Sequence, residues 1–514
     1  MTLRIVPALV LLCLVAFQIG SATAQTSQRM VVNADLGQDT ISRHLYGHFA
    51  EHLGRGIYDG IWVKAKSGGW QVREDVVEAL RAIRIPNLRW PGGCFADYYH
   101  WQDGIGPHDD RPTIVNNLWG GVTEDNSFGT HELMDLVEQL GAEAVVVGNV
   151  GSGTVQEMSQ WWEYMNHPGT SPMANLRRQN GRDKPWNVRY WGVGNESWGC
   201  GGNMRPEYYA DEYKRFATYL HAYGNVRPFR IAAGAAGDNY EWTEVMMREA
   251  GSMIDGIDLH HYTITGTWEK KGRATRFTEA EWLELMKNSL RWDELLTRHS
   301  AIMDQYDPEK RVWLIAGEWG TWHEGEPGSN PGFLYQQNTL RDALSASLAL
   351  NIFNRHVERV KMANIAQTVN VLQAMILTQG EQMILTPTYH VFELYSVHHD
   401  AVSLPITLDA GRYEHGGESI PAVSASASRD RDGRIHITMT NVDPKQARTV
   451  NATLRGQRAS QVSGRILTAD EMNAHNTFEQ PNAVQPASFN GARLSGERLT
   501  VQLPPKSLVV LELR

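Results

Sequence analysis

The chain has 514 residues, 42% of them hydrophobic, which allows a large folded core and argues against a disordered chain. The formal net charge of −10 at pH 7 argues against a nucleic-acid partner, which would call for a basic surface. Three cysteines and no Cys-x-x-Cys pair exclude a disulfide scaffold and the zinc sites that such pairs build. The 17 tryptophans indicate either a well-filled core or a site that stacks flat polar ligands.

The first 24 residues have the pattern of a secretory signal peptide. Arg4 supplies the positive charge, residues 5–19 form an apolar run too short to cross a bilayer comfortably, and Ala22-Thr23-Ala24 is a cleavage motif. An uncleaved membrane anchor is the alternative for this segment. We therefore expect an exported protein, periplasmic or secreted, without a membrane span after cleavage.

Between residues 44 and 400, short apolar runs alternate with amphipathic helical patterns, among them 73–83, 132–140 and 206–223. Eight segments are predicted as strands: 45–49, 87–90, 143–149, 188–194, 230–233, 257–260, 312–315 and 365–372. Continuous apolar strands that alternate with helices predict a parallel sheet, and eight such units favour a (β/α)8 barrel over a doubly wound sheet. No glycine-rich nucleotide motif supports the doubly wound alternative.

The pattern changes near residue 401. Three later segments alternate polar and apolar side chains with period two: 434–440, 498–503 and 507–513. We therefore predict an α/β fold in which a (β/α)8 TIM barrel, residues 44–400, precedes a C-terminal all-β sandwich, residues 401–514. Residues 25–43 contain one more strand, which we expect to join the sandwich.

Two glutamates stand at the ends of predicted barrel strands. Glu196 ends the fourth strand and Glu318 ends the seventh. Barrels of this class carry their active residues at the C-terminal strand ends, so these two side chains can meet across the barrel mouth. Glycoside hydrolysis requires a pair of carboxyl groups, one protonated and one ionised. Either glutamate alone could be a buried partner of an arginine, but the pair favours catalysis.

A competing motif, His48-x-x-Glu51-His52, fits the inverted zincin pattern of metalloproteases. A zincin carries this motif on a helix, where both histidines share one face. Here Gly47 and Gly54 flank the motif and a predicted strand leads into it, so a helix is disfavoured. We therefore expect no metal site, and we expect Glu51 to reach into the barrel mouth.

Seven segments in chain order carry a family resemblance: Phe49–Tyr58, Arg89–Gly93, Phe128–Glu132, Gly194–Glu196, His260–Tyr262, Gly317–Trp319 and Val369–Gln373. Together they resemble glycoside hydrolase family 51, the α-L-arabinofuranosidases of the large (β/α)8 glycosidase clan, over nearly the whole mature chain. The resemblance implies an exo-acting enzyme that removes terminal non-reducing α-L-arabinofuranosyl residues from arabinan, arabinoxylan or derived oligosaccharides. It also implies net retention, no metal and no organic cofactor.

The resemblance implies that Glu196 is the acid/base and Glu318 the nucleophile. The pKa of Glu196 should then be raised and that of Glu318 depressed. Their carboxyl groups should lie about 5–5.5 Å apart if the mechanism is retaining. The other implied site residues are Glu51 and Gln373 for furanose hydroxyls, Asn195 for the hydroxyl beside the anomeric carbon, Trp119 and Trp322 as aromatic walls, Arg89 and Tyr262 beside the nucleophile, and Cys94.

Cys94 departs from the commoner family pattern, which has asparagine after Pro-Gly-Gly. Cys200 lies four residues after Glu196, so both cysteines should lie near the barrel mouth. There they form either a disulfide, which export permits, or two small buried thiols.

Two rival functions remain at this point. One is another retaining glycosidase on the same scaffold, such as an endo-β-glucanase or xylanase. The other is a silent barrel that only binds polysaccharide, against which the intact Glu196 and Glu318 weigh. The expected partner is an arabinose-containing oligo- or polysaccharide. A homo-oligomer is also expected from the family, although no single residue indicates one.

Overall fold

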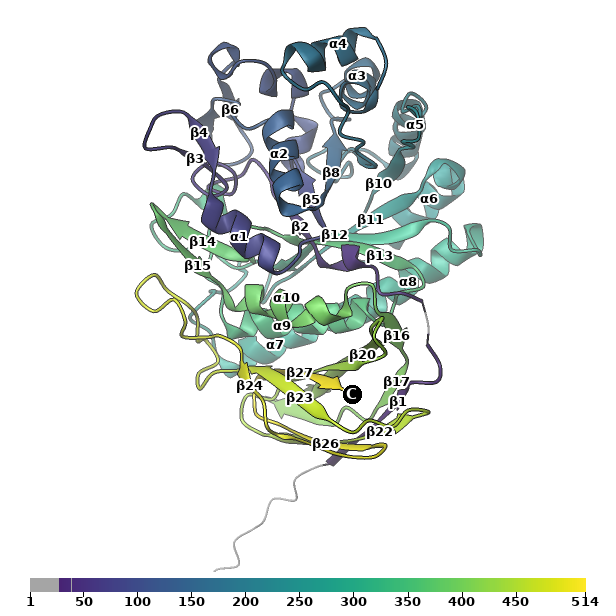
Figure 1. The fold of residues 1–514 in the computed structure, drawn as a ribbon, viewed down its shortest axis with the longest axis vertical. Coiled ribbons are helices and arrows are strands. Elements are labelled where there is room, and N and C mark those ends of the chain that lie inside the picture. The colour runs from purple at the N-terminus through teal and green to yellow at the C-terminus, as the bar shows by residue number, and fades with distance from the viewer. Residues whose placement is uncertain (1–26, 38) are drawn as a thin grey trace, which may run out of the picture.

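The structure is a computed structural model, and it describes residues 27–37 and 39–514. The expected signal segment, residues 1–24, lies outside the described residues. In the part of the chain that is described, no helix combines the length and the apolar character needed to span a membrane. Figure 1 shows a helix-wrapped barrel above a β-sheet module, with a layer of helices between them.

Eight parallel strands close into the barrel. Their order is β2 (Gly47–Phe49), β5 (Asn87–Trp90), β8 (Glu143–Gly148), β9 (Tyr190–Val193), β10 (Phe229–Ala236), β11 (Gly256–Thr263), β12 (Trp313–Thr321) and β13 (Val360–Ala366). Strand β13 pairs with β2 and completes the circle. This arrangement confirms the predicted (β/α)8 barrel.

The eighth strand lies earlier in the chain than predicted. It ends at Ala366, so most of the predicted strand 365–372 is a loop. The loop is nevertheless buried, because Val371 and Leu372 pack in one cluster with Phe49. A buried loop and a buried strand therefore gave the same apolar sequence pattern.

The helices are α1 (Glu74–Ala82), α2 (Thr130–Leu140), α3 (Val155–Asn166), α4 (Pro172–Gln179), α5 (Pro206–Ala217), α6 (Tyr240–Ala250), α7 (Glu279–Ser289), α8 (Arg291–Tyr306), α9 (Leu340–Phe353) and α10 (Pro387–Tyr395). Side-chain caps start several of them, and Thr278 and Thr339 each form a full capping box. Helix α5 stops before the predicted end at residue 223. Thr218 turns its hydroxyl back to the Lys214 carbonyl at that point.

Two β-bulges beside β11 shape the barrel mouth. Both β10 and β12 carry one more residue than β11 over the stretch around Asp258. Gly234 and Gly317 occupy these places. A Cβ atom on Gly234 would lie 1.3 Å from the Asp258 carbonyl oxygen, and one on Gly317 would lie 1.9 Å from Asp258 Oδ1. Only glycine fits at either place, and the bulges re-aim the side chains that follow them.

The C-terminal part consists of two facing sheets. The five-stranded sheet runs β17 (Ile406–Leu408), β1 (Ser27–Asn33), β22 (Arg448–Arg455), β26 (Arg498–Leu503), β25 (Ala492–Ser495). The six-stranded sheet runs β16 (Val402–Leu404), β20 (Val423–Arg429), β21 (Ile435–Asn441), β27 (Ser507–Leu513), β23 (Val462–Leu467), β24 (Ala487–Ser488). Strand β1 lies parallel to β22, so the N-terminal segment belongs to this module.

Four short hairpins complete the strands: β3 (Trp62–Lys64) with β4 (Trp70–Val72), β6 (Ile114–Asn116) with β7 (Val122–Glu124), β14 (Ile376–Gln379) with β15 (Gln382–Leu385), and β18 (Arg412–His415) with β19 (Glu418–Pro421). The first three project from loops of the barrel, and the last follows β17.

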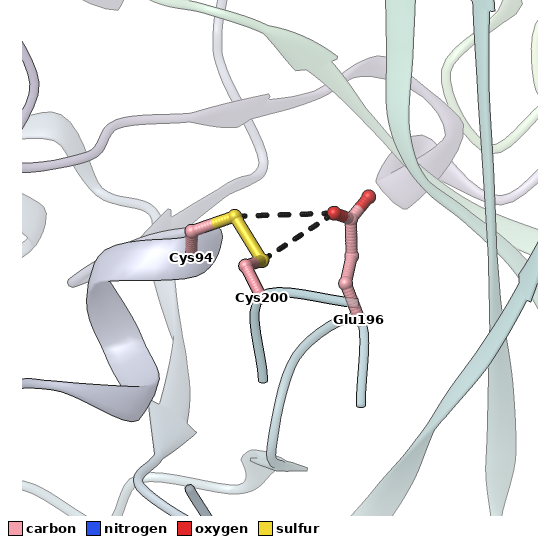
Figure 2. A group of neighbouring side chains, drawn as sticks. All are labelled: Cys94, Glu196 and Cys200. Atoms are coloured by element: carbon pink, nitrogen blue, oxygen red, sulfur yellow. Dashed lines mark hydrogen bonds between the residues drawn. A yellow bond between two sulfur atoms is a disulfide. The ribbon is translucent and has the colours of Figure 1, made fainter. Parts of the chain in front are cut away.

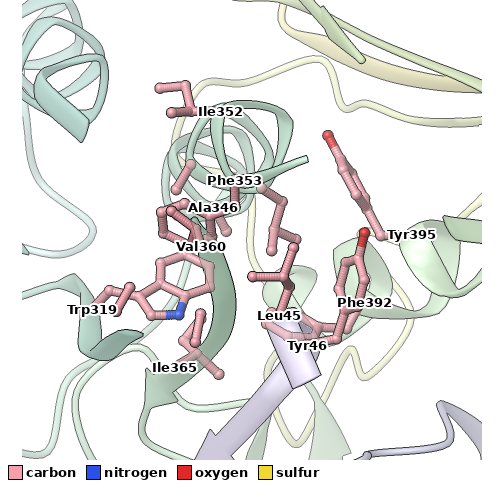
Figure 3. Packing of buried hydrophobic residues seen from close by; sticks show 14 of the residues in the cluster. Leu45, Tyr46, Trp319, Ala346, Ile352, Phe353, Val360, Ile365, Phe392 and Tyr395 are labelled. Carbon is pink, nitrogen blue, oxygen red and sulfur yellow. The ribbon is translucent and has the colours of Figure 1, made fainter. Parts of the chain in front are cut away.

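Helix α9 joins the barrel to the sandwich and is buried along its whole length. On the sandwich side, the side-chain oxygen Oδ1 of Asn351 accepts hydrogen bonds from the hydroxyl groups of Ser426 and Thr438, each at 2.8 Å. On the barrel side, Phe353 packs against Trp319 with ring centroids 5.3 Å apart (Figure 3). Because Trp319 follows Glu318 in β12, this packing fixes the strand that carries one of the two candidate carboxylates.

Candidate active site

Glu196 and Glu318 meet at the mouth of the barrel. Glu196 lies in the turn after β9, and Glu318 lies within β12. Nδ1 of His260 lies 2.9 Å from Oε1 of Glu196 and 3.6 Å from Oε1 of Glu318. One carboxylate oxygen of each glutamate lies within 4.8 Å of the other. The two carboxyl groups can therefore act on opposite sides of a single bond.

Two donors hold the carboxylate of Glu318. Arg89 donates from Nη1 to Oε1 at 2.8 Å, and the Tyr262 hydroxyl donates to Oε2 at 2.7 Å. Burial and the negative charge of Glu318 raise the pKa of Tyr262 well above its usual value, so its hydroxyl stays protonated. Arg89 also donates to Asn195 Oδ1 at 2.6 Å. A guanidinium and a neutral hydroxyl together stabilise negative charge on Glu318.

Glu196 has very different surroundings. Its Oε2 lies 3.6 Å from Sγ of Cys200 and 3.9 Å from Sγ of Cys94 (Figure 2). The two sulfur atoms are bonded, so of the two alternatives for these cysteines the structure has the disulfide. A disulfide has no hydrogen to donate and covers this side of the carboxyl group with weakly polar atoms. Burial raises the pKa of Glu196, with a further contribution from the charge of Glu318 and opposition from His260.

A buried carboxylate, not recognised in the sequence, anchors the turn that carries the acid/base candidate. Asp97 accepts the backbone N–H of Asn195 at 2.9 Å through Oδ2. Its Oδ1 accepts the N–H groups of Val150 at 2.7 Å and Gly151 at 2.9 Å. Glu196 itself has φ +40°, a backbone conformation that needs such support outside glycine. Asp97 lies in a short 3-10 helix rather than at a strand end, so the pattern of polar residues at strand ends does not indicate it.

Glu51 and Trp119 form another side of the site. Oε1 of Glu51 accepts the indole N–H of Trp119 at 3.0 Å and the backbone N–H of Phe95 at 2.9 Å. Its Oε2 accepts from Nε2 of Gln367 at 3.1 Å. Burial, together with the charge of Glu318, raises the pKa of Glu51 to about 7. A Cβ atom on Gly93 would lie 2.8 Å from Oε2 of Glu51, which explains the glycine in the Pro-Gly-Gly motif.

Gln373, predicted to hold furanose hydroxyls, does not join this cluster. Its Oε1 accepts the backbone N–H of Thr321 at 2.7 Å. Its Nε2 donates to the Asp342 carbonyl at 2.8 Å and to the Thr388 hydroxyl at 3.1 Å. The protein framework uses both ends of this amide, so the prediction for Gln373 is corrected.

Gln367 takes the place that was predicted for Gln373. It contacts Glu51, and within the described residues its buried Oε1 has no hydrogen-bond partner. The error follows from the displaced strand. Since β13 ends at Ala366, the glutamine at the strand end is residue 367 and not residue 373.

Aromatic side chains lie around the two carboxyl groups. Trp322 packs edge-on against Tyr262 with ring centroids 5.0 Å apart, and it also contacts Trp268 at 5.3 Å. Trp119, Tyr262 and Trp322 all pack on the apolar cluster that includes Phe49. Beside Glu196 and His260 lies a cavity of about 310 Å³, whose other lining residues include Trp198, Trp268, Asp238, Asn288 and Arg291.

The two histidines of the His-x-x-Glu-His motif have structural surroundings. His48 lies on β2 with its ring 5.0 Å from that of Phe392, and burial lowers its pKa to about 3. His52 faces Glu124 at 2.9 Å through Nδ1 and accepts the indole N–H of Trp90 at 3.2 Å through Nε2. Among the described residues, neither histidine belongs to a group of three or more side chains that could bind a metal ion together. This geometry does not fit a zincin, so the metalloprotease alternative is excluded.

Two groups of possible ligands do converge at the mouth, but neither fits a metal ion. One comprises Glu196, His260 and Glu318, the other Cys94, Glu196 and Cys200. Both imidazole nitrogens of His260 face carboxylate oxygens, and the cysteine sulfurs are bonded to each other. The ligand atoms of both groups are therefore already engaged.

Comparisons with known proteins agree with these observations. The family model described as "Alpha-L-arabinofuranosidase 1 domain" matches residues 79–280, and the one described as "Alpha-L-arabinofuranosidase C-terminal domain" matches residues 317–507. A protein of Bacteroides ovatus named "Intracellular exo-alpha-L-arabinofuranosidase" is 52% identical over 498 residues, which cover 96% of this chain and 97% of the relative.

Solved structures show the same similarity. The GH51 arabinofuranosidase from Xanthomonas axonopodis pv. citri is 52% identical with a TM-score of 0.94, covering 95% of this chain and 100% of that chain. An arabinose complex of the α-L-arabinofuranosidase from Thermotoga maritima is 31% identical with a TM-score of 0.83, covering 95% of this chain and 99% of that chain.

These comparisons correct the expectation of export. The relative that matches nearly the whole chain is named an intracellular enzyme, which contradicts a periplasmic or secreted location. The expected signal peptide, residues 1–24, lies outside the described residues. The apolar run near the N-terminus was therefore not a sufficient basis for assigning a compartment.

Proposed function

Since the chain belongs to glycoside hydrolase family 51 and is an exo-α-L-arabinofuranosidase, we propose that it works with retention of configuration through Glu196 and Glu318. Its proposed substrates are terminal non-reducing α-L-arabinofuranosyl residues of arabinan, arabinoxylan or the oligosaccharides derived from them. Glu196 is the acid/base and Glu318 the nucleophile.

The observation that carries this proposal is the short separation of two carboxyl groups in unlike surroundings. Oxygens of Glu196 and Glu318 lie within 4.8 Å of each other. Retaining glycosidases hold their carboxyl groups about 5–5.5 Å apart, whereas inverting enzymes need about 6.5–9.5 Å to admit a water molecule. Arg89 and Tyr262 stabilise the charge of Glu318, while burial favours the protonated form of Glu196. These environments support different roles for the two residues.

In the first step, a carboxylate oxygen of Glu318 attacks the anomeric carbon and forms a glycosyl ester. The bond from that carbon to the leaving oxygen breaks, and Glu196 gives its proton to this oxygen. In the second step, the Glu196 carboxylate takes a proton from water. The hydroxide so generated attacks the anomeric carbon and releases Glu318 as a carboxylate. Two inversions give net retention.

The terminal furanose is held by the cluster on the other side of Glu318. Glu51 and Gln367 offer hydrogen bonds to its hydroxyl groups, and the unpartnered Oε1 of Gln367 supports that role. Asn195, fixed by Arg89, contacts the hydroxyl next to the anomeric carbon. Trp119 and Trp322 enclose the ring, and Cys94 acts through the disulfide that covers Glu196. The departing sugar chain occupies the cavity beside Glu196.

Proton NMR of a reaction in progress tests the proposal. The enzyme is mixed with an aryl α-L-arabinofuranoside, and the anomeric signal of the first-formed arabinose is recorded before mutarotation. The expected first product is the α-anomer. A β-anomer formed first would overturn retention, and turnover of only the matched β-D-xylopyranoside or β-D-glucopyranoside would overturn the substrate assignment.

A further inference from the structure

A buried aspartate stands behind the catalytic residues at the barrel mouth. Asp258 lies on β11, and its side chain is only 9% exposed. Its Oδ2 lies 3.0 Å from Nε2 of His260, and its Oδ1 accepts the backbone N–H of Leu259 at 3.0 Å. The other ring nitrogen of the same histidine, Nδ1, lies 2.9 Å from Oε1 of Glu196. One imidazole therefore bridges a buried aspartate and the acid/base.

The regular pairing of β11 with both of its neighbouring strands is interrupted beside this aspartate. The bulges in β10 and β12 flank Asp258 on both sides, and glycines 234 and 317 leave the space for its carbonyl and carboxylate groups. Arg89, which holds the nucleophile, also approaches Asp258 Oδ2 at 3.9 Å. β-Bulges of this kind are common beside active sites, where they redirect side chains. The two bulges around Asp258 therefore indicate a functional role for its carboxylate rather than simple packing.

We propose that Asp258 is a positioning residue that acts through His260. It keeps both ring nitrogens of His260 protonated and the ring turned toward Glu196, so that the acid/base faces an N–H donor in both chemical steps. The proposal rests on the proposed role of Glu196 as acid/base.

The surrounding charges support a positively charged imidazole. His260 faces Glu196 from the turn after β9, Asp258 on its own strand and Glu318 on β12. Arg89 on β5 approaches Asp258 at 3.9 Å. Burial alone would lower the pKa of His260, but the charges of Glu318 and Asp258 outweigh it and raise the pKa to about 10. The charge of His260 in turn holds the pKa of Asp258 below its usual value against the effect of burial.

An N–H donor at Oε1 directs the proton of Glu196. Since Nδ1–H of His260 donates to Oε1, the proton that Glu196 transfers resides on Oε2. In the second step the same donor stabilises the Glu196 carboxylate while Oε2 takes the proton of water. Without a charge on Asp258, a neutral His260 that keeps its proton on Nε2 presents a bare Nδ1 to Glu196. The proton of Glu196 is then drawn to Oε1, away from the leaving group.

The test is the pH dependence of kcat/KM for Asp258→Asn, measured on an arabinofuranoside with a poor leaving group. The alkaline limb of this profile reports the acid in the free enzyme. A positive His260 lowers the pKa of Glu196, so loss of that charge raises it. We expect the alkaline limb to move to higher pH by about one unit or more, and kcat/KM at the optimum to fall about 10- to 100-fold. His260→Gln should move the limb in the same direction.

The matched control is Asp255→Asn. Asp255 immediately precedes β11 and pairs with Arg230 at 3.1 Å near the surface, away from the catalytic network. Its variant should keep the wild-type alkaline limb. A lower rate for Asp258→Asn at every pH with an unmoved limb would mean a purely structural role and would overturn the proposal.

The variant Glu196→Ala distinguishes a failure of this proposal from a failure of the proposed function. If Glu196 is the acid, this variant has no alkaline limb. A limb that persists in Glu196→Ala would overturn the role of Glu196 itself. A limb that is lost there but unmoved in Asp258→Asn would overturn the role of Asp258 alone.

A spectroscopic measurement on the wild-type enzyme covers the case in which Asp258→Asn does not fold. With ¹⁵N-labelled histidine, and with His260→Gln to assign the signal, NMR at pH 8 should show His260 protonated on both ring nitrogens. A neutral ring at pH 8 would overturn the proposal.

Discussion

The Sγ atom of Cys200 lies 3.6 Å from Oε2 of Glu196, and this sulfur is bonded to Cys94. The bond joins the loop after β5 to the loop after β9 and spans 106 residues of sequence. It therefore restrains the chain at the point where the acid/base turn leaves the barrel. It also places a group that cannot donate a hydrogen bond beside one oxygen of the acid/base.

The first prediction concerns this bond. Intact-mass spectrometry without reductant should find Cys94 and Cys200 joined. Cys94→Ser combined with Cys200→Ser should lower the free energy of unfolding by up to about 5 kcal/mol, because the unfolded chain loses a long loop constraint. Urea unfolding measures this loss. Two free thiols in the untreated protein would contradict the disulfide.

The second prediction concerns acidity. The disulfide covers one side of Oε2 of Glu196 without donating a hydrogen bond to it, and burial raises the pKa of that residue. Two serine hydroxyls in place of the sulfurs donate hydrogen bonds to the carboxylate and so favour its ionised form. The alkaline limb of kcat/KM should therefore move to lower pH in the double serine variant. This direction is opposite to that expected for Asp258→Asn, and a shift to higher pH would contradict the account.

The third prediction separates two glutamines. Gln367 faces Glu51, so Gln367→Ala should lower kcat/KM by about tenfold or more through loss of a hydrogen bond to the sugar. The amide of Gln373 bonds only within the framework, so Gln373→Ala should lower the free energy of unfolding by about 1–3 kcal/mol with KM nearly unchanged. Steady-state kinetics and urea unfolding of both variants check this, and the reverse pattern would restore the original assignment of Gln373.

The fourth prediction concerns the glycine next to Cys94. A methyl group on Gly93 would lie 2.8 Å from Oε2 of Glu51, so Gly93→Ala should displace Glu51 and raise KM. Gly199→Ala is the matched control, because its Cβ would meet only the Glu196 carbonyl oxygen at an ordinary 3.7 Å. Equal KM values for the two variants would show that the Glu51 carboxylate has no fixed place in the site.

The barrel and its two glutamates could be predicted from the sequence, because each signal was local. Alternating strands and helices gave the fold class, and Glu196 and Glu318 stood beside recognisable motifs at strand ends. The tryptophans fall into both of the classes that the composition allowed. Trp90, Trp101 and Trp319 are buried core residues, whereas Trp119 and Trp322 lie at the site.

Three other residues at the site, Asp97, Asp258 and Gln367, could not be predicted, because their contacts arise only in three dimensions. Asp97 binds backbone groups that are far from it in sequence. Asp258 reaches His260 only because two neighbouring strands bulge around it. Gln367 was passed over because a buried loop has the apolar pattern of a strand. Tertiary packing overrides local periodicity in each of these cases.

The most direct test of the catalytic assignment is the configuration of the products formed in the presence of azide. Glu196→Ala and Glu318→Ala are each given an arabinofuranoside with a good leaving group together with sodium azide. In Glu196→Ala the nucleophile remains, so azide attacks the glycosyl ester and the account predicts an α-arabinofuranosyl azide. In Glu318→Ala azide takes the place of the missing carboxylate, so the account predicts the β-azide. The opposite pair of configurations would exchange the two roles, and the α-azide from both variants would contradict Glu318 as the nucleophile.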